Sequence, residues 1–203
     1  MAVLENTKKV VKIEGDMAAV NKRLAVVEEH MGEMVVRSEI SPILLDFNKV
    51  AEQREYIFLN GQPMRASELY IDIYAKAKRN IVIIDDYISI KTLRHLQKVK
   101  PSVRVTIFSD NKGSYLHKSD YADFVKERPG VKIDFVRTEG LVHDRFIVVD
   151  YEEDSETIYH CGASAKDAGG KVTAVGKFED TLVKKAMNEV IERLKVNRKL
   201  VLK

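Results

Sequence analysis

The chain has 203 residues, which is enough for one sizeable domain and an appendage. Hydrophobic residues make up 45% of the sequence and charged residues 32%, as expected of a soluble globular protein. The formal net charge of +3 permits a phosphate-bearing partner without indicating one. No apolar stretch approaches the roughly 18 residues that a membrane-spanning helix needs.

The sequence also predicts a cytoplasmic protein that has no membrane partner. Charged residues recur from Glu5 onward, which excludes the apolar core of a signal peptide. The single cysteine, Cys161, cannot form an internal disulfide and is typical of a reducing compartment. Because Cys161 lies in an apolar segment, we interpret it as a small core residue rather than a reactive thiol.

Residues 1–40 are predicted to form an N-terminal coiled-coil helix. Apolar residues recur in heptads, with one polar exception, at Val3, Asn6, Val10, Ile13, Met17, Val20, Leu24, Val27, Met31 and Met34. In a parallel pairing, Lys9 would face Glu14 of a second copy. β-Branched residues at the d positions of the heptad, Ile13, Val20 and Val27, fit a tight parallel dimer poorly, so the stoichiometry is open to a trimer or tetramer as well as a dimer. The alternative is a single helix packed on its own domain.

The heptad phase breaks between Val36 and Ser41, and the second domain is placed at residues 41–203. Ser41 followed by Pro42 is typical of a helix start and predicts a helix over 42–53. Strands are then expected at 56–59, 81–84, 103–108, 131–136, 145–149, 157–161 and 172–175. Helices are expected at 66–77, 90–99, 121–128 and 179–194. This alternation predicts an α/β sandwich with a mixed or mostly parallel sheet.

The segment His143–Asp150 carries the most specific pattern. It reads His-x-Arg-x4-Asp and is followed by Gly162, Ala163 and Ser164. If the strand includes His143, alternation along it places His143 and Arg145 on the same face. A histidine that can attack phosphorus beside a cation that can hold phosphate oxygens suits phosphodiester transfer.

This pattern, and the order of the elements over about residues 60–194, resemble the phospholipase D superfamily. The resemblance implies an α/β/α sandwich with a mixed sheet, in the small nuclease-like branch that has one motif per chain. It implies a site shared across a homodimer, with no metal and no cofactor. His143 would be the nucleophile, and the same residue of a second copy would protonate the leaving oxygen.

Arg145 stands where the family has lysine. Its planar guanidinium can hold two phosphate oxygens, so phosphate binding tolerates this change better than catalysis does. The resemblance gives Asp150 a supporting role by hydrogen bonding, within a catalytic set of His143, Arg145 and Asp150. The alternative for Arg145 is a structural ion pair with Asp150 or Glu139, and the alternative for His143 is an ordinary surface or core histidine.

Gly162-Ala163-Ser164 stands where the family has Gly-Ser-x-Asn, so the asparagine is absent. We expect Ser164 and Lys166 to join Arg145 in binding phosphate, although Lys166 reads equally well as a solvated loop residue. The family's downstream carboxylate, which orients the histidine, is also missing from residues 169–177. Supporting roles are therefore assigned to Gly162, Asp167 and Glu179.

Two other residue groups have ordinary explanations as well as functional ones. His160, on the strand next to the motif, is a candidate to support His143. Asp85 and Asp86 follow a predicted strand, where sites often form, but they read equally well as caps of the next helix. No histidine shows metal-ligand spacing.

Two functions remain open. The first is a metal-independent phosphodiesterase or nuclease that uses a phosphohistidine. The second is a degenerate binding or scaffold module that oligomerises through its coiled coil and holds a phosphate-bearing ligand or a protein partner. Nucleic acid is preferred over lipid because basic residues accompany the domain at Lys76, Lys78, Arg79, Lys98 and Lys100. That group reads equally well as a solvated face.

Overall fold

The computed structural model describes residues 14, 16–25 and 55–203. Residues 14 and 16–25 are helical and exposed. The rest of the predicted coiled coil, the helix predicted over 42–53 and the boundary predicted at residue 41 lie outside the described residues. The coiled coil and its oligomeric state therefore stay predictions. Residues Gln53–Lys203 form one compact unit, which is described below by itself.

A seven-stranded mixed sheet runs through this unit in the order β1-β7-β6-β5-β2-β3-β4. Strands β2, β3 and β4 are parallel, and the other four pair antiparallel. The strands are β1 (Glu55–Phe58), β2 (Asn80–Ile84), β3 (Arg104–Phe108), β4 (Lys132–Val136), β5 (Arg145–Val149), β6 (Thr157–Cys161) and β7 (Thr173–Phe178). The predicted α/β sandwich is thus confirmed, with a sheet that is mixed rather than mostly parallel.

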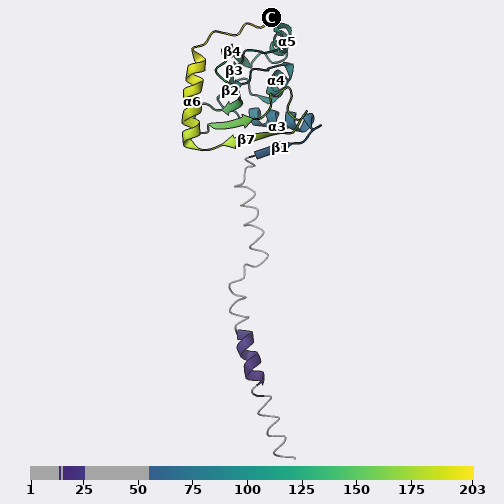
Figure 1. Cartoon of the computed structure of the whole chain (residues 1–203), viewed down its shortest axis with the longest axis vertical. Helices are drawn as coiled ribbons and strands as arrows, with labels where there is room; N and C mark the ends of the chain where they lie inside the picture. The colour runs from purple at the N-terminus through teal and green to yellow at the C-terminus, as the bar shows by residue number, and fades with distance from the viewer. Residues whose placement is uncertain (1–13, 15, 26–54) are drawn as a thin grey trace, which may run out of the picture. The chain divides into compact units, whose positions relative to one another are not determined.

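Helices cover both faces of the sheet. The helix α6 (Thr181–Lys195) lies on one side, and α3 (Pro63–Ala75), α4 (Ile90–His95) and α5 (Lys118–Glu127) lie on the other, as Figure 1 shows. The strands obey the two-residue alternation: Ile81 and Ile83 of β2 face the α3 side, whereas Val82 and Ile84 face the α6 side. Both faces of the central strands are buried, which explains their continuous apolar runs.

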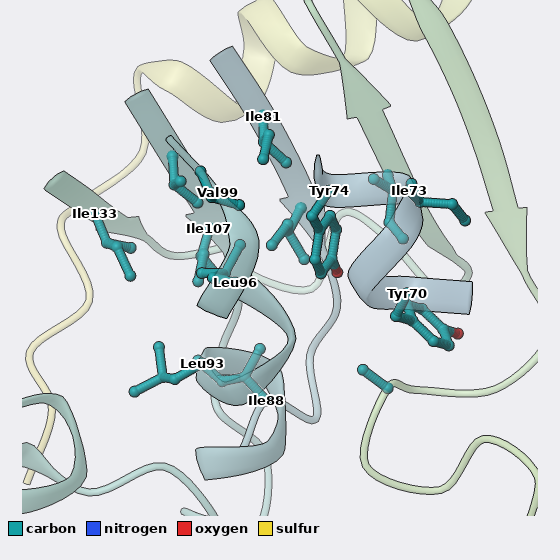
Figure 2. Packing of buried hydrophobic residues seen from close by; sticks show 14 of the residues in the cluster. Tyr70, Ile73, Tyr74, Ile81, Ile88, Leu93, Leu96, Val99, Ile107 and Ile133 are labelled. Atoms are coloured by element: carbon teal, nitrogen blue, oxygen red, sulfur yellow. The ribbon is translucent and has the colours of Figure 1, made fainter. Parts of the chain in front are cut away.

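The larger core lies between the sheet and helices α3 and α4. Figure 2 shows Ile81, Ile107 and Ile133 of neighbouring strands packing toward these helices and the short turn η1 (Leu96–Lys98). Helix α3 contributes Tyr70, Ile73 and Tyr74, which are all buried. Ala66 of the same helix is buried as well. Cys161 is also buried here, and burial raises the pKa of its thiol to about 12. Its interpretation as a core residue is confirmed.

Two helices begin about three residues earlier than predicted, because their start signals lie outside the apolar pattern. Pro63 occupies the start of α3, where its missing N–H costs no hydrogen bond. At the start of α5, the Asp120 carboxylate accepts a hydrogen bond of 2.9 Å from the backbone N–H of His117. Pro63 and Asp120 therefore determine where these helices begin. The apolar periodicity indicates only the buried part of each helix.

The C-terminal segment after α6 returns to the sheet and lies along β4. Lys199 forms an antiparallel bridge with Val136, and the N–H of Leu200 donates to the Phe135 carbonyl at 3.0 Å. This segment covers an edge strand that would otherwise present unpaired backbone groups. Among the described helices, none combines the length and the apolar character that crossing a membrane requires.

Candidate functional site

Arg145 of the motif lies at the end of the sheet where strand β2 ends and strand β5 begins. The two strands are antiparallel, and Ile84 at the end of β2 pairs with Phe146 near the start of β5. Asp85 therefore follows β2 close to the point at which Arg145 opens β5. Both residues occupy odd positions, so they belong to the face that carries α3 and α4. The fold thus brings a carboxylate and a guanidinium together on one face of the sheet.

His143 lies outside the strand. Strand β5 begins at Arg145, and the His143 side chain, in the preceding loop, is 96% exposed. The strand alternation used to place His143 beside Arg145 therefore does not extend to it. No hydrogen bond or ion pair joins His143 to Arg145, Ser164 or Lys166 within the described part of the chain. In one copy of the chain, the histidine and the predicted phosphate-binding cations stay separate.

Asp144, which occupies the x position between the histidine and the arginine of the motif, contacts His143. Nδ1 of His143 lies 3.0 Å from Oδ1 of Asp144. This hydrogen bond lowers the pKa of Asp144, so the carboxylate stays ionised. An ionised carboxylate can only accept, so Nδ1 of His143 carries the proton. The other ring nitrogen, Nε2, is then left with a free lone pair in a neutral imidazole.

The same carboxylate bridges to a second histidine. Oδ2 of Asp144 lies 3.3 Å from Nε2 of His160, on strand β6. The His160 ring stacks on Phe178, with centroids 6.0 Å apart and an interplanar angle of 7°, and it also contacts Phe146. His160 is thus linked to His143 through the Asp144 carboxylate and not by a direct contact. The bridge lies on the α6 face, opposite the face of Arg145.

Arg145 makes neither of the ion pairs considered from the sequence. Its guanidinium carbon lies 5.7 Å from the centroid of the Tyr87 ring, within the range of a cation–π contact. Glu139 pairs instead with Arg198 at 2.9 Å. Asp150 lies at the other end of β5 and binds other groups. Arg145 is half-buried, so its charge can meet a ligand at the end of the sheet.

Asp150 supports the fold at a distance from the motif histidine. Its carboxylate accepts backbone hydrogen bonds of 2.8 Å from both Lys78 and Arg79, and one of 3.1 Å from the Ser155 hydroxyl. Burial raises the pKa of Asp150, but these hydrogen bonds outweigh burial and lower it overall. Its φ of 54° is in the left-handed region that aspartate and asparagine tolerate. Asp150 therefore fixes the entry into β2.

Asp85 connects the end of β2 to the loop after β6. It is only 4% exposed, and its carboxylate accepts from the backbone N–H of Tyr87 at 2.9 Å and of Ala165 at 3.2 Å. Burial raises the pKa of Asp85, while these two hydrogen bonds and the charge of Arg145 oppose the increase. Asp85 thereby holds Ala165, and with it the neighbouring Ser164 and Lys166, against the end of β2.

Ser164 and Lys166, the other predicted phosphate ligands, both contact Asp167. The Lys166 ammonium lies 2.5 Å from Oδ2 of Asp167, and the hydroxyl of Ser164 donates to the same oxygen at 3.4 Å. Ser164 is buried, whereas the Lys166 side chain is 21% exposed. Lys166 can reach a ligand only by leaving Asp167, so a bound phosphate would compete with this carboxylate.

The loop that carries these residues is fixed at its far end. Gly169 has φ +77°, and its carbonyl accepts from the Gln62 N–H at 2.8 Å. A Cβ at Gly169 would lie 2.3 Å from the Gln62 carbonyl oxygen, so only glycine fits this approach.

Two predicted supporting residues lie outside this loop. The backbone N–H of Gly162 donates to the Ala174 carbonyl, and Glu179 pairs with Lys177 at 3.1 Å. Gly162 thus has a backbone role next to the loop.

Asp85 and Asp86 do not cap the helix that follows them. Ser89 caps α4, and Asp86 instead accepts from the backbone N–H of Asp110 at 2.9 Å and the Thr138 hydroxyl at 2.6 Å. Its other oxygen lies 2.7 Å from the Lys112 ammonium. The capping interpretation is therefore wrong. Asp86 joins the ends of the parallel strands, a contact that local sequence spacing cannot reveal.

The structure adds three residues that the sequence did not indicate, Tyr87, Asp144 and Tyr115, and it gives Asp85 a contact with the loop after β6. Of these three, only Asp144 has a local signal in the sequence. It is a carboxylate directly next to the motif histidine, while the downstream carboxylate that the resemblance implies is missing. Tyr87 and Tyr115 come from loops that the fold brings together. Among the described residues, no group of three or more histidine, cysteine or acidic side chains is arranged to hold a metal ion.

Neither the family models nor the curated proteins include a match to this sequence. Solved structures that this chain resembles include TrmBL2, an archaeal chromatin protein whose structure shows a novel mode of DNA binding (TM-score 0.47, 14% identity, 93% of this chain and 66% of that one). The chain spans just under two thirds of that protein's length. NucT from Helicobacter pylori has TM-score 0.49 and 12% identity over 72% of this chain and 99% of that one.

Nuc from Salmonella typhimurium, described as a phospholipase D family member, has TM-score 0.49 and 18% identity over 72% of this chain and 98% of that one.

Proposed function

We propose that this chain is a metal-independent phosphodiesterase of the nuclease type, with His143 as its nucleophile. The observation that carries the proposal is the hydrogen bond of 3.0 Å between Nδ1 of His143 and Asp144, made by a histidine that is otherwise exposed. In the neutral imidazole this hydrogen bond puts the free lone pair on Nε2, the exposed ring nitrogen, which is the atom that would attack phosphorus. Arg145, two residues along the chain, supplies a fixed positive charge that can hold phosphate oxygens on the other face of the sheet.

The reaction would proceed in two displacements. Nε2 of His143 attacks phosphorus, and a P–N bond forms as the bond from phosphorus to the leaving oxygen breaks. The leaving oxygen takes a proton from the imidazolium of His143 in a second copy of the chain. That histidine, now neutral, removes a proton from water, which attacks phosphorus and breaks the P–N bond. Protons and bonds balance, and both enzyme groups return to their initial states.

A second copy is part of this proposal because one chain does not assemble the site. His143 contacts Asp144 on the α6 side, whereas Arg145 and Lys166 lie toward the α3 side. Pairing two copies through the domain face near residue 143 would place one exposed histidine opposite the other. The predicted coiled coil would hold the copies together, and either a dimer or a tetramer satisfies this requirement.

The alternative is a binding or scaffold module, and one observation favours it. Lys166 is paired with Asp167 at 2.5 Å, and the buried Ser164 contacts the same carboxylate. Two side chains that were predicted to bind phosphate therefore contact Asp167 instead. In this alternative, Arg145 holds a phosphate-bearing ligand without catalysis. The same fold then serves binding, and the coiled coil provides multivalency.

The deciding experiment is cleavage of labelled single-stranded and double-stranded DNA and RNA in EDTA, beside the His143→Ala variant. We expect EDTA-resistant cleavage that the variant loses. A matched control is Lys132→Ala, which removes an exposed cation at the opposite end of the parallel strands. Equal traces from the wild type and His143→Ala would reject the enzyme and favour the binding module.

A further inference from the structure

Two tyrosines that do not belong to the motif flank its cations. Tyr87 follows strand β2, and Tyr115 lies in the loop between β3 and α5. Tyr115 is 49% exposed, so its ring is accessible to a ligand. Both loops leave the sheet at the carboxyl ends of parallel strands, where ligand sites of α/β folds gather.

The cations of the site lie over these rings. The Lys166 ammonium is 4.7 Å from the centroid of the Tyr115 ring and 5.9 Å from that of Tyr87. The Arg145 guanidinium carbon is 5.7 Å from the Tyr87 centroid. All three distances are within the range of cation–π contacts. We call the set of Tyr87, Tyr115, Arg145 and Lys166 the cation–tyrosine platform.

The loop that presents Tyr115 is specified by the sequence. Gly113 has φ +83°, and a Cβ there would lie 2.3 Å from the Tyr115 ring, so glycine makes room for the ring. The Asn111 side chain closes the loop, with Nδ2 donating to the Leu116 carbonyl at 2.9 Å and Oδ1 accepting from the Leu116 N–H at 3.3 Å. Tyr115 is therefore held at the surface by its own loop.

Other groups add positive charge and limit negative charge. The Lys91 ammonium lies 3.5 Å from the Lys166 carbonyl, which adds a third cation to the edge of the platform. Of the nearby carboxylates, Asp85 is buried and Asp86 is paired with Lys112 at 2.7 Å. Asp167 is the exposed carboxylate at the platform, and it is paired with Lys166. An incoming phosphate can replace Asp167 on Lys166.

We propose that the cation–tyrosine platform binds single-stranded nucleic acid. Arg145 and Lys166 hold backbone phosphates, and an unpaired base stacks on Tyr115. Aromatic rings interleaved with cations are the surface that single strands require, because base faces are accessible to a ring only when they are not stacked in a duplex. This inference rests on the proposed function, since it names the substrate class of that same site.

The test is fluorescence anisotropy with a short labelled oligothymidylate and a hairpin duplex of matched length. The His143→Ala protein serves as the background, so that binding is measured without cleavage. We expect tighter binding of the single strand than of the duplex. Tyr115→Ala should weaken single-strand binding by roughly 5- to 150-fold, the equivalent of about 1–3 kcal/mol per stacked base. Tyr115→Phe, which keeps the ring, should bind like the background protein.

Charge gives a second, independent readout. Lys166→Ala should reduce the slope of log affinity against log salt by about 0.7, as expected for one phosphate contact to a single strand. Lys132→Ala, at the opposite end of the parallel strands, should leave the slope unchanged. Circular dichroism of each variant separates a local loss from unfolding.

Failure of the platform and failure of the enzyme give different results. Single-strand binding that depends on Tyr115, in a wild-type protein that cleaves nothing, supports the platform and rejects the phosphodiesterase. Cleavage with the same KM in the wild type and in folded Tyr115→Ala rejects the platform and keeps the enzyme. Equal or tighter binding of the duplex, or binding of acidic peptides or anionic vesicles in place of the oligonucleotide, also overturns the inference.

Discussion

Nδ1 of His143 and Oδ1 of Asp144 are 3.0 Å apart, although the two residues are neighbours in the sequence. Adjacent side chains on a regular strand point to opposite faces, so this contact depends on His143 lying in the loop before β5. The hydrogen bond from His143 lowers the pKa of Asp144 and keeps the carboxylate ionised. In the proposed function, Asp144 takes the orienting role of the carboxylate that is missing downstream.

Loss of the Asp144 charge should lower kcat. Asp144→Asn keeps the shape of the side chain but loses the charge that fixes the Nδ1 proton of His143. A hydrogen bond to a charged group contributes about 1.5–3 kcal/mol, so kcat should fall by roughly 10- to 150-fold. KM should stay near the wild-type value, since Asp144 does not contact substrate. Unchanged kcat in a folded Asp144→Asn protein would contradict the orienting role.

Asp150 should act on stability rather than on chemistry. Asp150→Asn retains a residue that tolerates its φ of 54° but removes the charge that accepts hydrogen bonds from Lys78, Arg79 and Ser155. We expect the free energy of unfolding to fall by about 1–3 kcal/mol in urea titrations. Because the folded-state pKa is lowered, the wild-type advantage exists above the unfolded pKa and is lost as pH falls through the folded value. Identical unfolding midpoints at neutral pH would contradict this account.

A buried histidine predicts a second pH dependence. His95 is 2% exposed, stacks on Tyr70, and has no hydrogen-bond partner at either ring nitrogen among the described residues. Burial, with a smaller effect of Lys91, lowers the pKa of His95 to about 4 from 6.5. Between these two values the unfolded chain binds more protons, so stability falls as pH decreases from 6.5 toward 4.

The full loss from His95 corresponds to about 3 kcal/mol, at 1.36 kcal/mol per pKa unit. His95→Phe keeps the stacked ring but cannot be protonated, and it should flatten the dependence in this pH window. Urea titrations at pH 7 and pH 5 of both proteins measure the difference. Parallel pH profiles for the wild type and the variant would mean that another group causes the loss.

Asp167 competes with phosphate for Lys166 in this account. Asp167→Asn removes the carboxylate that pairs with the ammonium at 2.5 Å, while an amide keeps the contact with Ser164. An exposed ion pair is worth about 0.2–1 kcal/mol, so single-strand affinity should rise by roughly 1.5- to 5-fold. The same anisotropy assay measures it. Weaker binding by Asp167→Asn would show that Asp167 supports the ligand instead of competing with it.

The strands could be predicted from the sequence where burial on both faces determines their composition. Strands β2 and β5 are buried on both faces, so their apolar runs gave their positions closely, and Arg145–Val149 coincides with the predicted strand. The starts of α3 and α5 were placed too late, because proline and a side-chain cap set them rather than apolar spacing.

The site was predictable only in its local part. The motif identified His143, Arg145 and Asp150 as a set, but strand alternation was extended two residues too far to place His143. The contacts of Asp86 with Thr138 and of Lys166 with Tyr115 join segments about 50 residues apart. Such contacts depend on strand order, which residue spacing along the chain does not encode.

The most direct test of the central claim is to trap the covalent intermediate. The wild-type protein is mixed in EDTA with an oligonucleotide substrate, quenched in alkali, where phosphohistidine survives, and digested for mass spectrometry. The account predicts a nucleotidyl group bound through a P–N bond to the peptide that contains His143. This adduct should be absent from His143→Ala and reduced in Asp144→Asn. Turnover in EDTA with no adduct at His143, or with the adduct on another residue, would contradict it.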